Sequence, residues 1–273
     1  MKIYFYRAEE ENFGDELNLS IWPKVFGDYI DGDGQYLCGI GSILDSRLCD
    51  LDGKKIIFGV GARGPGNPIV FDDTFDVRFV RGPRTAALYD GVEFITDPGI
   101  LIAEFKEVQP RGSAIGLVGY FRSDQTVWRE VCSEMGMQYI SPNDDVETVL
   151  QRISECKRVF CEAMHGAIAA DALRIPWRPV SGFNAVHEHE THKFKWEDWC
   201  HSMDLEFDPL KLPPIWRQSN LRSKVAASIK RKYVLRKIDK DIKDDSFFLS
   251  DNKLFRIKVR RILSEINDLK RDM

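Results

Sequence analysis

The stretch Phe160–Ala167 combines a strand-like apolar segment, a histidine and a glycine at the start of an alanine-rich run. Because the N-terminus of a helix carries free N–H groups and the positive end of the helix dipole, it attracts anions. Gly166 would let an anion approach closely, and His165 would be a general acid or base beside it. A buried structural histidine is the alternative. Neighbouring Glu162 either orients the imidazole or points to the other face of the strand.

Three glycine-containing turns follow predicted strands in the first quarter of the chain, at residues 12–15, 39–42 and 59–65. In open α/β sheets ligands bind beyond the carboxyl ends of the strands, and glycine lets backbone N–H groups approach a sugar or an anion. We therefore expect turns at one sheet edge to line a ligand site. The predicted contacts are Asn12, Gly14, Gly41 and Ser42.

Charged side chains accompany these turns. Asp15 either accepts a proton or a hydrogen bond from a sugar hydroxyl, or it caps a helix beginning at Glu16. Arg63, Arg81 and Arg84 each come after a predicted strand. The planar guanidinium group suits carboxylates and phosphates, so these three are candidate anion ligands. Surface salt bridging is the alternative for each of them.

Other patterns carry weaker signals. The histidines of residues 187–192 lack the HExxH spacing of a metal site, and we expect a mobile cleft loop without a metal there. Asp31 and Asp33 flank a glycine as in the DxD of glycosyltransferases, but a tight turn explains them more simply. Trp196 is a predicted sugar-stacking contact, although pairs such as Trp196 and Trp199 more often lie in a core. The six cysteines form no CxxC pair, which indicates reduced and mostly buried thiols.

Strands alternate with helices along the first 205 residues, and the pattern restarts after a linker-like segment at 110–112. Such alternation is typical of βαβ units and a parallel sheet. Strands are predicted at 2–6, 36–40, 55–60, 77–80, 113–119, 137–140 and 158–161, and helices at 16–26, 84–89, 126–135, 146–156 and 167–173. We predict an α/β protein with two Rossmann-like lobes facing a cleft. The predicted limits are 1–109, 110–205 and, for a basic helical tail, 206–273.

The tail holds a strongly basic helix at about 217–240 and a second helix at about 252–269. The basic helix either contacts an anionic membrane surface or packs across both lobes with its cations in water. A net charge of −4 argues against a dedicated nucleic-acid binder. A secretory signal and an apolar run of about 20 residues are both missing. We therefore expect a soluble cytoplasmic protein, with peripheral membrane contact through residues 217–240 as an open alternative.

Five short motifs follow one another along the chain. They are Asn12-x-Gly14-Asp15, Gly39-x-Gly41-Ser42, Arg81-Gly82-Pro83-Arg84-Thr85, Thr96-Asp97-Pro98 and Met164-His165-Gly166. In this order they resemble the polysaccharide pyruvyl transferase family over about residues 1–205. The segment 194–203 is similar to the branch that pyruvylates succinoglycan-type exopolysaccharides.

The resemblance implies two lobes akin to GT-B glycosyltransferases and a transferase whose donor is phosphoenolpyruvate, with no further cofactor. The acceptor would be a sugar or a lipid-linked oligosaccharide, and the product a cyclic pyruvate ketal. The resemblance also implies that His165-Gly166 is the catalytic motif, that Arg84 or, second, Arg81 binds the donor, and that Asp15 is the family's early aspartate.

One departure from the family pattern concerns the donor. Many members carry an arginine two residues before the histidine, and this chain has Ala163 there. Another cation must then meet the donor, with Arg63, Arg122 and Arg174 as candidates. A nucleotide-sugar glycosyltransferase of similar shape is the alternative function, although no acidic ribose clamp stands out in the second lobe. A sugar- or phosphate-binding module without catalysis is the third.

Overall fold

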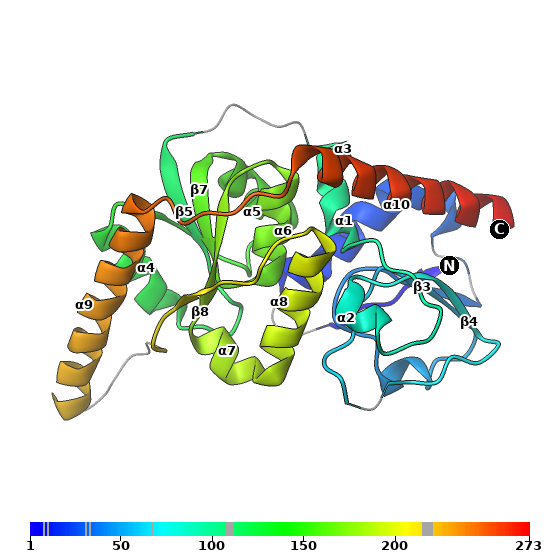
Figure 1. The fold of residues 1–273 in the computed structure, drawn as a ribbon, viewed down its shortest axis with the longest axis horizontal. Coiled ribbons are helices and arrows are strands. Elements are labelled where there is room, and N and C mark those ends of the chain that lie inside the picture. Colours follow the sequence, from blue (N-terminus) through cyan, green and yellow to red (C-terminus); the bar gives the residue numbers. More distant parts are fainter. Residues whose placement is uncertain are drawn as a thin grey trace.

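The computed structural model contains two α/β lobes side by side, with a long C-terminal helix lying along them (Figure 1). It describes residues 1–7, 9, 11–30, 32, 34–66, 68–106, 112–214 and 221–273, with the backbone alone for 221–227. The predicted pattern of Asp31 and Asp33, most of the linker at 110–112 and the start of the basic helix therefore lie outside the described residues.

The first lobe is built on a four-stranded sheet in which each neighbouring pair is parallel. The strands lie in the order β1 (Lys2–Ile3), β2 (Gln35–Cys38), β3 (Lys54–Phe58) and β4 (Phe75–Phe79). Ile56, Ile57 and Phe58 of β3 are all buried. Such a continuous apolar run is typical of a parallel strand covered on both faces.

The second lobe holds a five-stranded parallel sheet. Its order is β6 (Gln138–Ile140), β5 (Ala114–Val118), β7 (Cys156–Cys161), β8 (Trp177–Ser181) and β9 (Leu210–Lys211). The chain adds β6 on one side of β5 and then returns to add β7 on the other side. The strand order thus reverses between β5 and β7, and ligands of such sheets bind beyond the carboxyl ends of the strands at that reversal.

Helices cover both sheets, and polar side chains cap several of their N-termini. Asp124, Asp145 and Asp251 each accept hydrogen bonds from backbone N–H groups at the start of a helix. The α-helices are α1 (Phe13–Phe26), α2 (Pro83–Ala86), α3 (Ile102–Phe105), α4 (Gln125–Glu134), α5 (Val146–Ser154), α6 (Met164–Ala172), α7 (Phe183–Glu188), α8 (Glu190–Ser202), α9 (Leu221–Lys243) and α10 (Asn252–Asp272). Three 3-10 turns are η1 (Gly27–Tyr29), η2 (Ser46–Leu48) and η3 (Pro98–Leu101).

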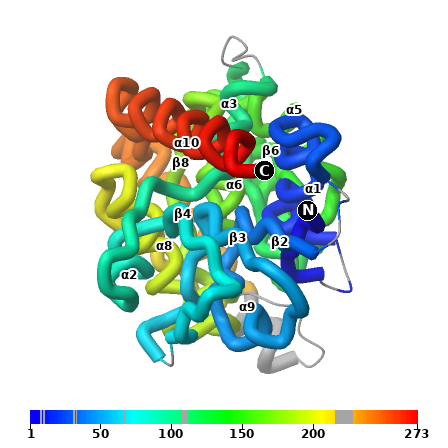
Figure 2. Tube along the Cα trace, turned by 90° about the vertical axis from the view of Figure 1, so that its right-hand side faces the viewer, coloured from blue at the N-terminus to red at the C-terminus, as the bar shows by residue number. Residues whose placement is uncertain are grey.

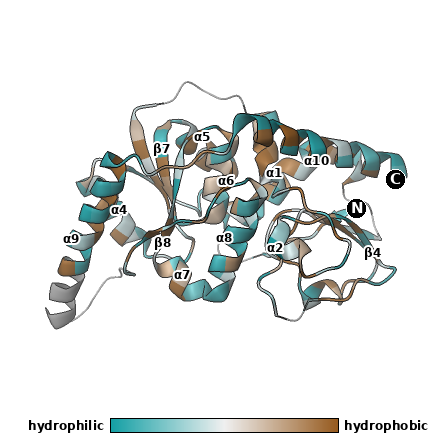
Figure 3. Ribbon diagram, in the orientation of Figure 1, coloured by the Kyte–Doolittle hydropathy of each residue, from teal (hydrophilic) through white to brown (hydrophobic). Residues whose placement is uncertain are grey.

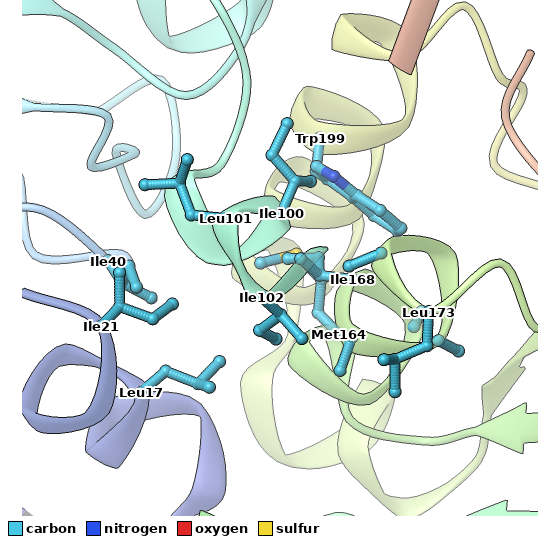
Figure 4. Packing of buried hydrophobic residues seen from close by; sticks show 14 of the residues in the cluster. Leu17, Ile21, Ile40, Ile100, Leu101, Ile102, Met164, Ile168, Leu173 and Trp199 are labelled. Carbon is cyan, nitrogen blue, oxygen red and sulfur yellow. The ribbon is translucent and has the colours of Figure 1, made fainter. Parts of the chain in front are cut away.

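Buried apolar side chains join the two lobes where α1, η3, α6 and α8 meet. Figure 4 shows Leu17 and Ile21 of α1, Ile100 of η3, Ile168 of α6 and Trp199 of α8 in this cluster, and each is at most 2% exposed. Burial of such a side chain contributes about 1.5–3 kcal/mol. This lobe-joining cluster therefore fixes the position of α1 and η3 relative to α6.

Helix α10 lies along both lobes (Figure 1), and Figure 2, which faces the first lobe, shows the C-terminal end of this helix on the viewer's side. Near its start, Phe255 is buried under the guanidinium of Arg174, which follows α6. At its end, Asp272 forms an ion pair of 2.7 Å with Arg78 of β4. Hydrophilic and hydrophobic residues alternate along this helix (Figure 3), as expected for an amphipathic helix with one buried face. No helix in the described parts of the chain has both the length and the apolar character needed to cross a bilayer.

The predicted α/β class with two parallel sheets is confirmed. The expected mobile cleft loop at 187–192 is wrong, because α7 ends at Glu188 and α8 begins at Glu190. Only His189 lies between them, with a φ of 50° that turns the chain sharply. The domain limits at 109 and 205 stay a prediction; the apolar core is continuous between the lobes, because α1 and α10 contact both.

Helix α10 offers a matched pair of isoleucines for a stability test. We expect Ile262→Ala to lower the free energy of unfolding by about 2–4 kcal/mol, because Ile262 is fully buried and its loss leaves a cavity. Ile257→Ala is the control, since Ile257 is 43% exposed on the same helix. Urea unfolding measures both. Equal and small effects would show that α10 is not packed as described.

Candidate active site

A pocket of about 380 Å³ opens where the carboxyl ends of the two sheets face each other. From the first lobe, its wall takes residues 12–15 at the start of α1, 41–43 after β2 and Arg63 after β3. From the second lobe it takes residues 120–122 after β5 and 163–165 after β7. The glycine turns of the first lobe and the strand reversal of the second therefore border one space.

The start of α1 presents a carboxyl group to this pocket. Asn12 is the N-cap, since its Oδ1 accepts from the N–H of Gly14 at 3.4 Å while its Nδ2 donates to Asp15 at 2.7 Å. Asp15 is therefore not the cap and lies in the first turn. Burial raises the pKa of Asp15, and the nearby His165 and the bond from Asn12 act in the opposite direction. A carboxyl group with a raised pKa is suited to exchange a proton with a bound substrate.

Asn18 ties α1 to the turn after β2. This fully buried side chain accepts hydrogen bonds from the N–H of Ile40 at 3.1 Å and from Nε1 of Trp22 at 2.9 Å, and it donates to the carbonyl of Ile40 at 3.1 Å. Gly41 follows with a φ of 122°, a conformation that favours glycine. Gly41 and Ser42 are thereby held beside the first turn of α1.

His165 lies in the first turn of α6, and its side chain is 14% exposed. A Cβ at Gly14 would overlap the imidazole, so this glycine lets the ring contact α1. On the other side, Nε2 lies 3.6 Å from Oδ2 of Asp97, the buried N-cap of η3. A Cβ at Gly166 would overlap Val118 of β5, so Gly166 serves the packing of α6 on the sheet and does not line the pocket.

The second lobe brings cations to the pocket. The guanidinium of Arg122 lies 3.1 Å from Nε2 of His187, and the hydroxyl of Tyr120 lies 3.0 Å from Nδ1 of the same ring. Burial and the charge of Arg122 lower the pKa of His187. The neutral ring accepts a hydrogen bond from Arg122 and so holds the guanidinium in place. Lys195 donates to Glu188 at 2.5 Å in the same wall.

The first lobe contributes two arginines to the wall. Arg47 is held by both carboxylate oxygens of Asp45, at 2.8 and 2.6 Å. Arg63 is exposed and makes no ion pair or hydrogen bond within the described residues. Together with the N-termini of α1 and α6, these cations make the pocket suited to an anionic ligand.

Arg81 lies behind the pocket wall, so it does not make the direct contact with the donor that was predicted for it. It is fully buried and forms an ion pair of 3.0 Å with Asp198 of α8. Thr85 donates to the same carboxylate from its backbone N–H at 2.8 Å and from its hydroxyl at 2.7 Å. Arg81 also donates to the hydroxyl of Ser42 at 2.9 Å. The residue therefore supports the predicted acceptor side and does not reach into the pocket.

Arg84 and Trp196 are also absent from the pocket wall. Arg84 forms an ion pair with Glu197 of α8, and its guanidinium lies over the ring of Phe194. Trp196 is fully buried and stacks on Phe207 with ring centroids 5.4 Å apart. The structure corrects the predicted stacking of Trp196 on a sugar, because a fully buried indole has no free face.

Glu162 does not orient His165. Its Oε2 accepts hydrogen bonds of 3.0 Å from the backbone N–H of Tyr120 and from Nε1 of Trp128. Burial raises the pKa of this carboxyl group to about 7, although its hydrogen bonds act in the opposite direction. Glu162 therefore fixes the loop after β5, which carries Arg122.

Sequence reasoning missed Asp97, Lys195 and Glu188 as parts of the site. Asp97 had a sequence signal, because an aspartate before a proline often caps a helical turn, although the motif Thr96-Asp97-Pro98 by itself assigns no role to this residue. No sequence signal indicated Lys195 or Glu188, since their contact depends on the tight junction between α7 and α8.

The histidines of residues 187–192 do not converge. His187 lies in the pocket wall, whereas His192 is buried against Trp196 and Phe207, and burial lowers its pKa to about 4. Among the described residues, no group of three or more histidine, cysteine, aspartate or glutamate side chains is placed to hold a metal ion. The cysteines form no disulfide, and Cys161 is buried.

Residues 14–182 match the family model described as polysaccharide pyruvyl transferase. The matched segment is more than half of the chain and includes both His165 and Asp15. The chain belongs to the polysaccharide pyruvyl transferase family. A curated relative, the succinoglycan biosynthesis protein ExoV of Rhizobium meliloti (strain 1021), is 32% identical in an alignment of 221 residues that covers 78% of this chain and 68% of the relative. No solved structure matches this chain, so its likeness to GT-B enzymes stays a prediction.

The buried Glu162 should make the stability of this protein depend on pH. Since the folded protein raises the pKa of Glu162 from 4.5 to about 7, it holds this proton more tightly than the unfolded chain does. The free energy of unfolding should therefore fall as the pH rises through this window, by about 3 kcal/mol. Glu162→Gln removes the titrating group and should remove this part of the loss.

Urea unfolding of the wild type and of Glu162→Gln is measured from pH 4.5 to 8. The effect is the difference in free energy of unfolding between the two proteins, in which the contributions of other titrating groups such as His192 cancel. Exposed Glu104 gives the control Glu104→Gln, whose difference from the wild type should stay constant. A constant difference for Glu162→Gln as well would contradict the raised pKa.

Proposed function

We propose that this protein transfers the pyruvyl group of phosphoenolpyruvate to a sugar of a bacterial surface polysaccharide or exopolysaccharide precursor, forming a cyclic pyruvate ketal and releasing phosphate. The family supports pyruvyl transfer to a polysaccharide, and the relative's name refers to succinoglycan biosynthesis. The observation that carries the proposal is the placement of His165 and Asp15 in one pocket, beside two helix N-termini and several cations.

The donor matches the charge of this pocket. Phosphoenolpyruvate carries a phosphate and a carboxylate, which need positive partners on more than one side. The N-termini of α1 and α6 supply backbone N–H groups and the positive ends of two helix dipoles. Arg63 approaches from the first lobe, and Arg122 and Lys195 from the second. Guanidinium groups bind both kinds of anion with two hydrogen bonds each.

Arg122 is our choice for the cation that replaces the arginine expected at Ala163. Val118 of β5 pairs with Cys161 of β7 in the parallel register, so the loops that follow them are neighbours. Both Arg122 and Ala163 line the pocket. Arg174, another candidate, hydrogen-bonds to the segment before α10 and does not line the pocket.

The reaction needs proton transfer at two points. A sugar hydroxyl adds to the carbon of phosphoenolpyruvate that carries the phosphate and loses its proton, and the neighbouring methylene carbon gains a proton to become a methyl group. Phosphate then leaves, and a second hydroxyl adds to the same carbon and loses its proton. We assign proton transfer to His165 and Asp15, whose side chains lie in one wall. Positioned acid–base groups of this kind typically contribute about 10²–10⁴-fold to the rate.

The acceptor would lie against the first lobe. Asn12, Gly41 and Ser42 offer amide, backbone and hydroxyl groups to sugar hydroxyls. Tyr6 and Phe121 line the pocket and take the aromatic role predicted for the buried Trp196. Aromatic faces suit the C–H groups of a sugar ring.

The place of action and the acceptor's carrier are also proposals. We place the enzyme in the cytoplasm, acting on a sugar or on a lipid-linked oligosaccharide. Peripheral membrane contact through the basic helix stays a prediction for α9. Part of this helix packs on the second lobe, since Val234 and Ile238 are buried and Arg231 forms ion pairs with Glu130 and Glu134 of α4.

Donor binding tests the proposal directly. Isothermal titration should show one site for phosphoenolpyruvate and none for a nucleotide sugar such as UDP-glucose. Arg122→Ala should weaken binding about 10- to 100-fold, because a hydrogen bond to a charged group contributes about 1.5–3 kcal/mol. Arg260→Ala on α10 is the matched control, since this arginine is exposed and lies outside the pocket. Binding of UDP-glucose alone would favour the glycosyltransferase alternative.

His165→Ala should lower turnover about 10²- to 10⁴-fold while phosphoenolpyruvate still binds within a few-fold of the wild type. Phosphate release in the presence of a panel of hexose glycosides measures turnover. His201→Ala, an exposed histidine of α8, is the control and should retain full activity. Wild-type turnover by a folded His165→Ala variant would contradict the assigned role.

A further inference from the structure

Two buried polar atoms face each other behind the pocket. Nε2 of His165 and Oδ2 of Asp97 are 3.6 Å apart, and neither has a hydrogen-bond partner in the structure. Buried polar groups are rarely left unpaired, because desolvation without a compensating bond costs free energy. A proton on Nε2 of His165 would satisfy both atoms after a shift of a few tenths of an ångström.

The fold holds the Asp97 carboxylate in this place from both sides. Its other oxygen, Oδ1, accepts from the N–H of Gly99 at 2.9 Å as the cap of η3. Gly99 in turn lies against Ile168 of α6, so η3 packs closely on the helix that carries His165. Thr96, the preceding residue, is anchored by a buried hydrogen bond of 2.8 Å to Ser202.

The geometry also distinguishes the two ring nitrogens of His165. Nε2 is buried and faces Asp97, whereas Nδ1 lies over Gly14 in the pocket wall. The other charged groups around the ring are Asp15 of α1 and, beyond it, Lys195 of α8. Nδ1 is therefore the nitrogen on the side where a substrate would bind.

We propose that Asp97 is a positioning residue that keeps the proton of neutral His165 on Nε2 and so presents the lone pair of Nδ1 to the substrate. The inference rests on the proposed function for its catalytic consequence, but the proton position itself can be measured without turnover. With Nδ1 unprotonated, His165 can take the proton of a sugar hydroxyl and return it to a neighbouring atom. With the proton on Nδ1, the ring could not accept one at that position.

Asp97→Asn tests this arrangement with little change in shape. The amide oxygen can still cap η3 by accepting from Gly99, which places the amide NH₂ opposite Nε2 of His165. Nε2 must then accept, so the ring proton moves to Nδ1. We expect kcat to fall about 10²- to 10⁴-fold, with the KM for phosphoenolpyruvate within about twofold of the wild type. Asp145→Asn, the same substitution at the exposed N-cap of α5 outside the pocket, is the control and should keep the wild-type kcat.

Two-bond ¹H–¹⁵N correlation spectra of protein with ¹⁵N-labelled histidine, recorded at pH 8.5, show which ring nitrogen carries the proton. His165→Gln assigns the signal among the five histidines. We expect Nδ1 to be unprotonated in the wild type and in Asp145→Asn, and protonated in Asp97→Asn. A proton on Nδ1 of the wild type, with or without one on Nε2, overturns the proposal even if Asp97→Asn does not fold. Unchanged turnover by a folded Asp97→Asn also overturns it, whereas failure of phosphoenolpyruvate to bind would instead count against the proposed function.

Discussion

The packing of α1 and η3 against α6 is the contact on which the geometry of the site depends. Leu17, Ile100 and Ile168 meet in a fully buried cluster between the lobes. Two N-terminal ends border the pocket as a consequence, that of α1 with Asn12 and that of α6 with His165, and the N-terminal end of η3 with Asp97 lies directly behind His165. An apolar contact thus decides where the polar groups lie, because it cannot slide without exposing hydrophobic surface.

Buried charges then fix the walls around this centre. Arg81 and Asp198 are both fully buried, and their ion pair joins the end of β4 to α8. Removing one partner of such a pair leaves an uncompensated charge, so the pair holds its two elements in one arrangement. Its bond to Ser42 extends that restraint to the pocket. Glu162 acts in a comparable way on the loop that carries Arg122, through Tyr120 and Trp128.

Local patterns predicted much of the fold and part of the site. The alternation of strands and helices was sufficient for the two parallel sheets, and glycines after strands marked the pocket edge at Gly14 and Gly41. No strand was predicted where β8 lies, because Pro179 within Trp177–Ser181 is unfavourable for an internal strand. The roles of Arg81 and Trp196 were misassigned, because their partners Asp198 and Phe207 could be identified only in the folded structure.

The sequence by itself determined the class of fold, the family and the presence of His165 at a helix start, because each depends on periodicity or on motifs of a few neighbouring residues. Only the tertiary structure decided which charged side chains form ion pairs within the protein and which line the pocket. Arg84 and Arg63 are equivalent in sequence terms, yet Glu197 occupies one and the other lines the pocket. Likewise, the approach of Asp97 to His165 spans 68 positions of the chain and follows from the packing of η3 on α6. Contacts of this kind arise from burial of apolar surface by whole elements, which no short stretch of sequence encodes.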